Sequence, residues 1–263
     1  MSTAENKDIE LGPTAQYVKV PQTLGNSIVT NPTFEYFDKI EKVHGYLSKQ
    51  FPTTANPAPL GLCAFALTTF VLSMMNAGGL VSIWASSKGV VMGLALFYGG
   101  LCQLLAGMWE FKTGNTFGAL AFSSYGGFWM SFGALFVDAF GFLKGYSGNG
   151  SDLNNDLGIY LMAWSMFSLW MTIASHRTTV ALTVLFFLVF LTFLMLSIHA
   201  FSGVIRAQEA GGCFGVMAAF LAWYCAYAGL LTKKNSFFTL PVGEWDPIYR
   251  SWGWLPAEEE EKH

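Results

Sequence analysis

The central part of this sequence has very little charge. Only 12% of the 263 residues are charged, 53% are hydrophobic, and most charged side chains lie before Asn56 or after Leu231. A water-exposed surface needs far more charge, so a soluble domain is excluded, and the apolar content excludes a disordered chain. A net charge of -3 without a basic cluster argues against nucleic-acid binding. The composition indicates a membrane protein.

Catalytic and metal-binding patterns are also missing. The cysteines lie singly in apolar stretches, at Cys63, Cys102, Cys213 and Cys225, and the four histidines are scattered. The sequence contains no H-E-x-x-H, no G-x-S-x-G and no glycine loop followed by Lys and Ser or Thr. We therefore predict no enzyme activity, no bound metal and no cofactor, and interpret the cysteines as small packing residues.

Six charge-free stretches occupy the middle of the chain, each long enough for a helix to cross a hydrocarbon core about 30 Å thick. They are Leu60–Trp84, Gly89–Trp109, Thr113–Val137, Leu157–His176, Thr178–Ile205 and Ala210–Thr232. Backbone groups in lipid must be satisfied internally, and the alternating strands of a barrel are absent from the sequence. We predict an all-α, polytopic membrane protein: a six-helix bundle in residues 56–232, with tails of residues 1–55 and 233–263.

The distribution of lysine and arginine predicts the orientation. With a cytoplasmic N-terminus, the inner side carries Lys42, Lys49, Lys112, Arg177, Lys233 and Lys234, and the outer side carries Lys88, Lys144 and Arg206. Both tails are therefore expected in the cytoplasm. The first 55 residues have no apolar core, so the first stretch itself is expected to direct insertion. The sequon at Asn149 falls in the longest external loop; whether it is glycosylated is open.

Glycines at regular spacing predict close contacts between helices. Gly93, Gly100 and Gly107 recur every seven residues, and Gly114 with Gly118 and Gly211 with Gly215 form GxxxG pairs. These faces suit either packing within one chain or contact between subunits, and the sequence does not separate the two.

Polar residues within the stretches are the candidate site residues, because each is costly in hydrocarbon unless it meets a partner or a water-filled cavity. Phe65, Thr69, Ser73 and Asn76 share one helix face, and Thr192 and His199 share another. Hydrogen bonds between helices would explain Thr69, Ser73 and Thr192 as well as a role in the site does. His199 suits either a proton relay or a hydrogen-bonded bundle residue, and Glu110 either a coupling role or an anchor at a span end.

The segment Asn56-Pro57 can begin a helix, because Asn is a good cap and Pro suits the first helical position. Free N–H groups and the helix dipole at such an end would attract a small carboxylate. An ordinary capped helix start explains the same residues.

The motif NPAPLGL, from Asn56 to Leu62, resembles the signature of the acetate uptake transporter family, which includes bacterial succinate-acetate permeases and fungal acetate and ammonia-export proteins. Further matching segments run to Glu244, among them Gly114–Gly118, Ser124–Gly126 and Leu240–Glu244. The long polar N-terminal tail is more similar to the fungal members. The resemblance implies a plasma-membrane homohexamer with a pore through each subunit that passes acetate and other small monocarboxylates.

The resemblance also implies a narrow apolar waist at Phe65, Tyr125 and Val189, where Val189 stands in place of an expected leucine. An apolar waist opposes an unpaired carboxylate strongly. We therefore expect Tyr125 to donate a hydrogen bond to the substrate, Asn56 to hold it at the entrance, or a proton to cross with it. The rival hypothesis is a membrane sensor of acid or ammonium, or an ammonium exporter; a sensor would need a docking element in the N-terminal tail.

Overall fold

The computed structural model describes residues 39–40, 42–43, 54–78, 89–146, 150–245 and 249. Contacts divide the chain into two units, Met1–Ala55 and Asn56–His263, and the second contains the long helices. The sequon at Asn149 and Lys49 of the N-terminal tail lie outside the described residues.

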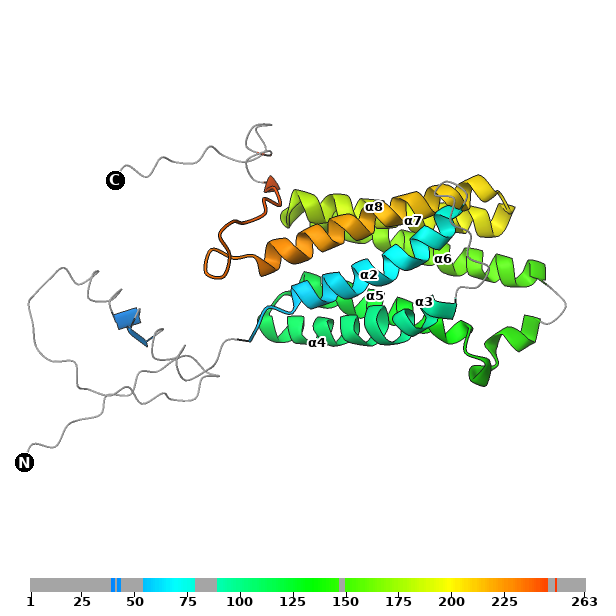
Figure 1. The fold of residues 1–263 in the computed structure, drawn as a ribbon, viewed down its shortest axis with the longest axis horizontal. Coiled ribbons are helices and arrows are strands. Elements are labelled where there is room, and N and C mark those ends of the chain that lie inside the picture. The colour runs from blue at the N-terminus through cyan, green and yellow to red at the C-terminus, as the bar shows by residue number, and fades with distance from the viewer. Residues whose placement is uncertain are drawn as a thin grey trace, which may run out of the picture. The chain divides into compact units, whose positions relative to one another are not determined.

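Long helices lying side by side make up the second unit (Figure 1). They are α2 (Ala58–Ala77), α3 (Gly89–Gly93), α4 (Gln103–Thr113), α5 (Thr116–Leu135), α6 (Gly150–Ala174), α7 (Val180–Ser202) and α8 (Ile205–Leu230). A π-helix, η2 (Leu94–Cys102), joins α3 to α4, and short 3₁₀ turns η3 (Asp138–Phe140), η4 (Phe142–Tyr146) and η5 (Ser175–Arg177) lie between the longer elements. The prediction of an all-α membrane protein is confirmed.

Within the described residues, five helical stretches are long and apolar enough to cross a membrane. They are Ala58–Ala77, Gly89–Thr113, Gly150–Arg177, Val180–Ser202 and Ile205–Leu230. Helix α5, at 20 residues, is as long as α2, but its Gly, Ser, Tyr and Trp residues lower its hydropathy and it is not among the five. The sixth span stays a prediction.

Several helix ends differ from those expected. Helix α2 ends at Ala77, where Gly78 adopts φ 34° and donates its N–H to the Met74 carbonyl; the expected end of this stretch, Trp84, lies outside the described residues. Helix α6 begins at Gly150, before the expected Leu157, since an acidic first turn is favourable at a helix N-terminus. A charged residue marks where a helix leaves the hydrocarbon core, but it does not end the helix itself.

Glycines allow the helices to approach closely within this one chain. A Cβ added at Gly107 would lie 2.6 Å from the Ser123 backbone nitrogen of α5. One added at Gly212 would lie 2.3 Å from the backbone nitrogen of Ala77. Gly211 and Gly215 likewise face α7 and α2 side chains, whereas a Cβ at Gly93 would meet nothing within 4 Å. The GxxxG pair in α8 is therefore explained by packing inside the subunit.

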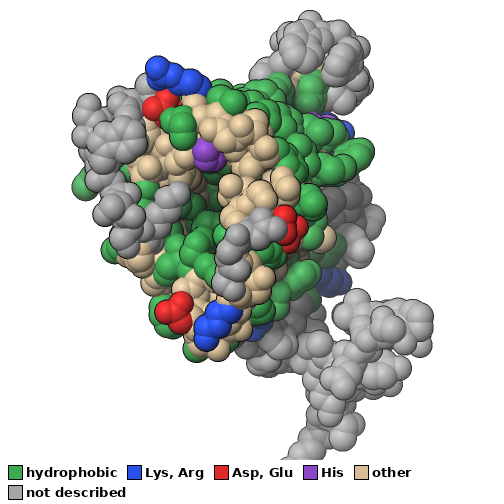
Figure 2. Space-filling view, turned by 90° about the vertical axis from the view of Figure 1, so that its right-hand side faces the viewer, with side chains coloured by type: hydrophobic (Ala, Val, Ile, Leu, Met, Phe, Trp, Pro, Cys, Tyr) green, Lys and Arg blue, Asp and Glu red, His purple; other side chains and the backbone are tan. Residues whose placement is uncertain are grey.

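Successive long helices run in opposite directions. The two ends of the bundle can be identified by the residues of α2 that lie there. Gly229 of α8 lies beside Pro59 at the start of α2, and Gly212 lies beside Ala77 at its end. We call these the Asn56 end and the Asn76 end. At the Asn56 end, the carbonyls of Val242 and Gly243 accept hydrogen bonds from the first N–H groups of α7. Figure 2 shows the Asn76 end, with hydrophobic side chains on the flanks and a few scattered charges.

Candidate functional site

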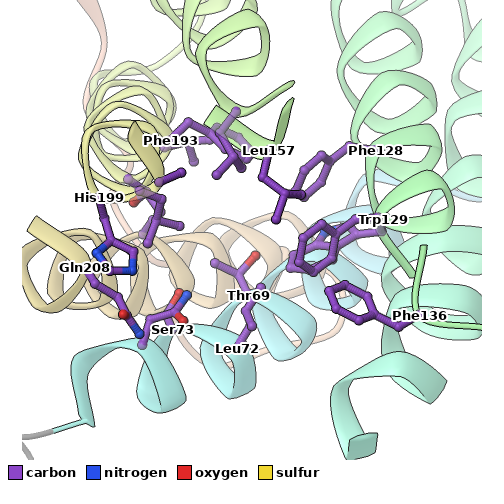
Figure 3. Close-up of a pocket in the computed structure, with 18 of the residues that line it drawn as sticks. Thr69, Leu72, Ser73, Phe128, Trp129, Phe136, Leu157, Phe193, His199 and Gln208 are labelled. Carbon is purple, nitrogen blue, oxygen red and sulfur yellow. The ribbon is translucent and has the colours of Figure 1, made fainter. Parts of the chain in front are cut away.

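A cavity of about 310 Å³ opens at the Asn76 end and runs into the bundle; we call it the outer cavity. Residues from α2, α3, α5, α6, α7 and α8 line it, and the walls are mostly apolar and aromatic. In Figure 3, His199, Gln208 and Ser73 lie on one side, while Phe128, Trp129 and Phe136 lie across from them. Such a chamber, apolar with a few polar groups, is the usual form of a small-molecule site.

Most of the site residues predicted from sequence line this outer cavity. They are Phe65, Thr69, Ser73, Asn76, Val189, Thr192 and His199. The four residues of α2 do so because their spacing places them on one side of that helix, as the periodicity predicted. No Asp, Glu, Lys or Arg is among the lining residues that the structure describes, so the lining of the outer cavity offers no fixed charge to an ion.

A much smaller cavity of about 20 Å³ lies beyond the outer one; we call it the inner cavity. Its lining includes Leu62, Gln103, Tyr125 and Phe186. Phe65 and Val189 line both cavities. The two residues therefore form the partition between the cavities, and the ring of Tyr125 lies 5.8 Å from that of Phe65, measured between centroids. We call Phe65, Tyr125 and Val189 the waist.

The hydroxyl group of Tyr125 has a protein partner. Tyr125 is 2% exposed, and its Oη lies 2.8 Å from Oγ of Ser168 on α6. Its ring lies among other rings, nearly parallel to that of Phe193 at 6.5 Å between centroids. The sequence did not show that α6 would supply a partner for this hydroxyl. The expectation that Tyr125 donates to the substrate therefore has to compete with Ser168.

Unpartnered polar atoms lie on both sides of the waist. In the described part of the chain, Thr69 Oγ1 and Trp129 Nε1 are buried without a hydrogen-bond partner and belong to residues that line the outer cavity. Oε1 of Gln103, which is 1% exposed, is equally unpartnered and belongs to the lining of the inner cavity. Buried polar atoms are nearly always satisfied, so these three would bond a passing polar molecule once a small shift of the lining exposes them.

Sequence reasoning missed Trp129 and Gln103 as site residues. Trp129 follows Tyr125 by four residues on α5, as Thr69 follows Phe65 on α2, so both lie one turn beyond the waist. Periodicity along α5 could therefore have found Trp129. Gln103 comes directly after the π-helix η2, whose wider turns shift the register of the residues that follow. No sequence pattern marked that shift.

Two predicted residues, Asn56 and Glu110, line neither cavity. Oδ1 of Asn56 accepts the N–H of Ala58 at 3.0 Å, so Asn56 caps the start of α2 as expected. Pro59 has no N–H, and the Gly61 N–H is donated to the Pro57 carbonyl, so few donors remain there for an anion. Capping therefore occupies an N–H group at the start of α2 that the proposed anion site at Asn56 would need.

Glu110 is 2% exposed near the end of α4, and its carboxyl group packs beside Gly118 in the first turn of α5. Thr113 Oγ1 lies 2.9 Å from the Glu110 carbonyl oxygen and 3.2 Å from Oε2, while Oε1 has no partner in the described part of the chain. This burial argues against a snorkelling anchor, because a snorkelling side chain keeps its charged group in water.

His199 lies where the outer cavity opens. Its Nδ1 is 3.1 Å from the carbonyl oxygen of Val204, just beyond the turn at Gly203 that ends α7. That contact satisfies one ring nitrogen, and the ring lines the outer cavity beside Gln208 (Figure 3). His199 is therefore placed to meet a solute at the cavity mouth rather than at the waist. Among the described residues, no cluster of His, Cys, Asp or Glu could hold a metal ion.

Comparisons with known proteins identify relatives of this chain. Residues 41–245 match the model of the GPR1/FUN34/yaaH family. The chain is 50% identical over 195 residues to ammonia transport outward protein 2 of Saccharomyces cerevisiae, covering 72% of this chain and 68% of that protein. It is 45% identical over 219 residues to acetate permease A of Emericella nidulans, covering 78% and 72%. Its structure matches that of the bacterial acetate channel SatP with a TM-score of 0.62 and 33% identity, covering 73% of this chain and 100% of that one.

Proposed function

This chain belongs to the GPR1/FUN34/yaaH family, and we propose that it is a membrane transporter or channel for acetate and other small monocarboxylates. The observation that carries the proposal is the pair of cavities separated by Phe65 and Val189. Similarity to acetate permease A and to the acetate channel SatP supports acetate as the solute.

The walls suit a small acid with one apolar group. The methyl group of acetate gains by contact with Phe65, Phe128 and Val189, at roughly 0.8 kcal/mol for each buried carbon. Its oxygens can accept hydrogen bonds from Thr69 and Trp129, whose donors are otherwise unpartnered. A sugar or an amino acid would bring more polar groups than these walls can satisfy.

Crossing the waist is the difficult step for an anion. Desolvating an unpaired carboxylate costs several kcal/mol even after relaxation, and no positive charge lines the cavities in the described chain. Movement as the uncharged acid, with a proton carried alongside, avoids that cost. Proton-coupled passage is therefore part of the proposal, with the donors outside the waist holding the acid before it crosses.

The proposed location, orientation and assembly of the protein are based on its charge distribution and on its family. We assign the chain to the plasma membrane, with six spans and both tails in the cytoplasm, so that the outer cavity opens to the cell exterior. We also assign a homohexamer with one pathway in each subunit. The exposed aromatic side chains on the bundle, such as Phe97, Trp170 and Phe220, supply apolar surface for lipid or a neighbouring subunit.

Ammonium export is the second candidate, because the chain is 50% identical to ammonia transport outward protein 2. Aromatic rings such as those of Phe128 and Trp129 can attract a small cation by cation–π interaction. Vesicles loaded with an ammonium salt distinguish the two. Ammonia that leaks through the bilayer acidifies the lumen of empty vesicles, whereas export of the ammonium ion by the protein shifts the lumenal pH in the alkaline direction, whatever acid is supplied.

Uptake of labelled acetate by proteoliposomes that contain only this protein tests the proposal. We expect uptake above that of empty vesicles at acidic external pH, reduced by an excess of unlabelled acetate. Uptake equal to that of empty vesicles would contradict transport and favour a sensor that binds acid and acts through its tail.

A further inference from the structure

The Tyr125 hydroxyl belongs to a short chain of hydrogen bonds that leads away from the cavities. Tyr125 Oη lies 2.8 Å from Ser168 Oγ, and Ser168 Oγ donates at 2.8 Å to the carbonyl of Trp164, one turn back in α6. Ser168 is fully buried and lines neither cavity. The bond therefore turns the hydroxyl of a waist residue toward α6.

Counting protons fixes the direction of this chain. A serine hydroxyl has one proton to donate, and that of Ser168 goes to the Trp164 carbonyl. Serine in a helix commonly donates in this way to the carbonyl one turn back. By distance alone either hydroxyl could donate across the Tyr125–Ser168 contact; with the serine proton placed on the Trp164 carbonyl, the tyrosine is the donor. The phenolic proton is consequently committed to Ser168 and is not offered to a molecule at the waist.

Among the described residues that face Tyr125, no charged group takes the place of its hydroxyl as a partner for the solute. The rings around it come from α2, α6 and α7, at Phe65, Trp164, Phe167, Phe186 and Phe193. On the α4 side, Gln103 lines the same cavity and is neutral. His199 lines the outer cavity at its mouth, and Glu110, which lines neither cavity, packs beside Gly118 two turns before Tyr125. The waist itself is uncharged.

We propose that Ser168 is a positioning residue that withholds the Tyr125 proton from the pathway, so that the waist passes the uncharged acid and rejects the carboxylate. This inference rests on the proposed function. Ser168 acts through Tyr125 and touches no substrate. Without its acceptor oxygen, the phenol would be left in an apolar wall with the solute as its best partner, and a carboxylate is a stronger acceptor than an uncharged acid.

Replacing Ser168 with alanine tests the proposal through the charge that crosses. Initial acetate uptake is measured in proteoliposomes at zero and at inside-positive membrane potential, set with potassium and valinomycin. For the unmodified protein the ratio of the two rates stays near one, because an uncharged acid does not respond to the potential. For Ser168→Ala the ratio rises by roughly 2- to 10-fold, which is the factor that a potential of about 20 to 60 mV exerts on the transfer of one elementary charge.

Two further variants separate this role from a general effect on packing. Ser168→Ala combined with Tyr125→Phe removes the released donor, so the ratio returns to near one. Ser131 makes the same kind of chain outside the cavities: it donates to the Phe128 carbonyl at 2.9 Å and lies 2.7 Å from the Tyr160 hydroxyl. Ser131→Ala therefore leaves the ratio near one. Ser168→Cys keeps a similar volume with a weaker acceptor, and shows the same rise if the alanine variant fails to insert.

Three results overturn the inference. They are a potential-driven ratio in the unmodified protein, an unchanged ratio in inserted Ser168→Ala or Ser168→Cys, and a raised ratio that persists after Tyr125→Phe is added. Each of these requires measurable acetate uptake by the unmodified protein. Absence of any uptake at either potential contradicts the proposed function instead, so the two failures are distinct.

Discussion

Shortening Val189 to alanine is expected to change which acids pass the waist. Val189 is 4% exposed and belongs to the lining of both cavities, so its two methyl groups are part of the partition between them. Removing them widens the passage while leaving Phe65 and Tyr125 in place. Lactate, which is larger than acetate by a carbon and a hydroxyl, should gain most.

The size of the effect follows from the contacts removed. Fit to a pocket discriminates one methylene group by roughly 1 to 3 kcal/mol, or about 10- to 200-fold, and the lower figure applies where neighbours relax into the space. We therefore expect the lactate-to-acetate uptake ratio to rise about 10-fold. The same truncation should lower the free energy of unfolding by about 2 kcal/mol, from lost burial and the new space.

The assay is competitive uptake of labelled lactate and acetate by proteoliposomes. Val184→Ala is the matched control, because Val184 lies on the same helix, is 44% exposed and lines neither cavity. That variant should keep the ratio of the unmodified protein. An unchanged ratio in folded, inserted Val189→Ala would refute the assignment of Val189 to the filter.

Three other changes probe the entrance, the cavity mouth and the packing. Asn56→Asp should keep the cap on Ala58 but weaken acetate uptake if an anion binds there. Asn56→Ala should also lower the free energy of unfolding by about 1 kcal/mol. An unchanged apparent affinity for acetate in the Asp variant removes the entrance site. His199→Gln should flatten the pH dependence of uptake if the imidazole ring carries the proton, and a profile parallel to the unmodified protein's argues against a proton role. Gly107→Ala should destabilise the bundle by about 1 to 3 kcal/mol, because the new Cβ would lie 2.6 Å from the Ser123 backbone nitrogen; a melting temperature equal to that of the unmodified protein contradicts this close contact.

Some of the candidate site could be predicted because it depends on a single helix. Phe65, Thr69, Ser73 and Asn76 lie on one face by the 100° rotation of successive residues, and all four line the outer cavity. Charge-free stretches likewise identified where the long helices lie. Both inferences use the regular geometry of a helix and need no knowledge of its neighbours.

The remaining features depend on contacts between helices, or on irregular backbone. Ser168 reaches Tyr125 only because α6 packs beside α5, and no spacing within either helix reveals that bond. Gln103 reaches the inner cavity after a π-helix, which shifts the register that periodicity assumes. Asn56 was expected to serve the substrate, but its carboxamide turns back to its own helix.

Blocking the outer cavity chemically tests most directly whether acetate passes through it. In a background without the native cysteines, Leu157→Cys places a thiol on the cavity lining, while Asn155→Cys places one on the exposed side of the same helix. Both are treated with a membrane-impermeant, negatively charged methanethiosulfonate reagent, and acetate uptake is measured. The account predicts that uptake stops for the variant at position 157 and continues for the one at position 155. Full modification at position 157 with uptake unchanged would contradict it.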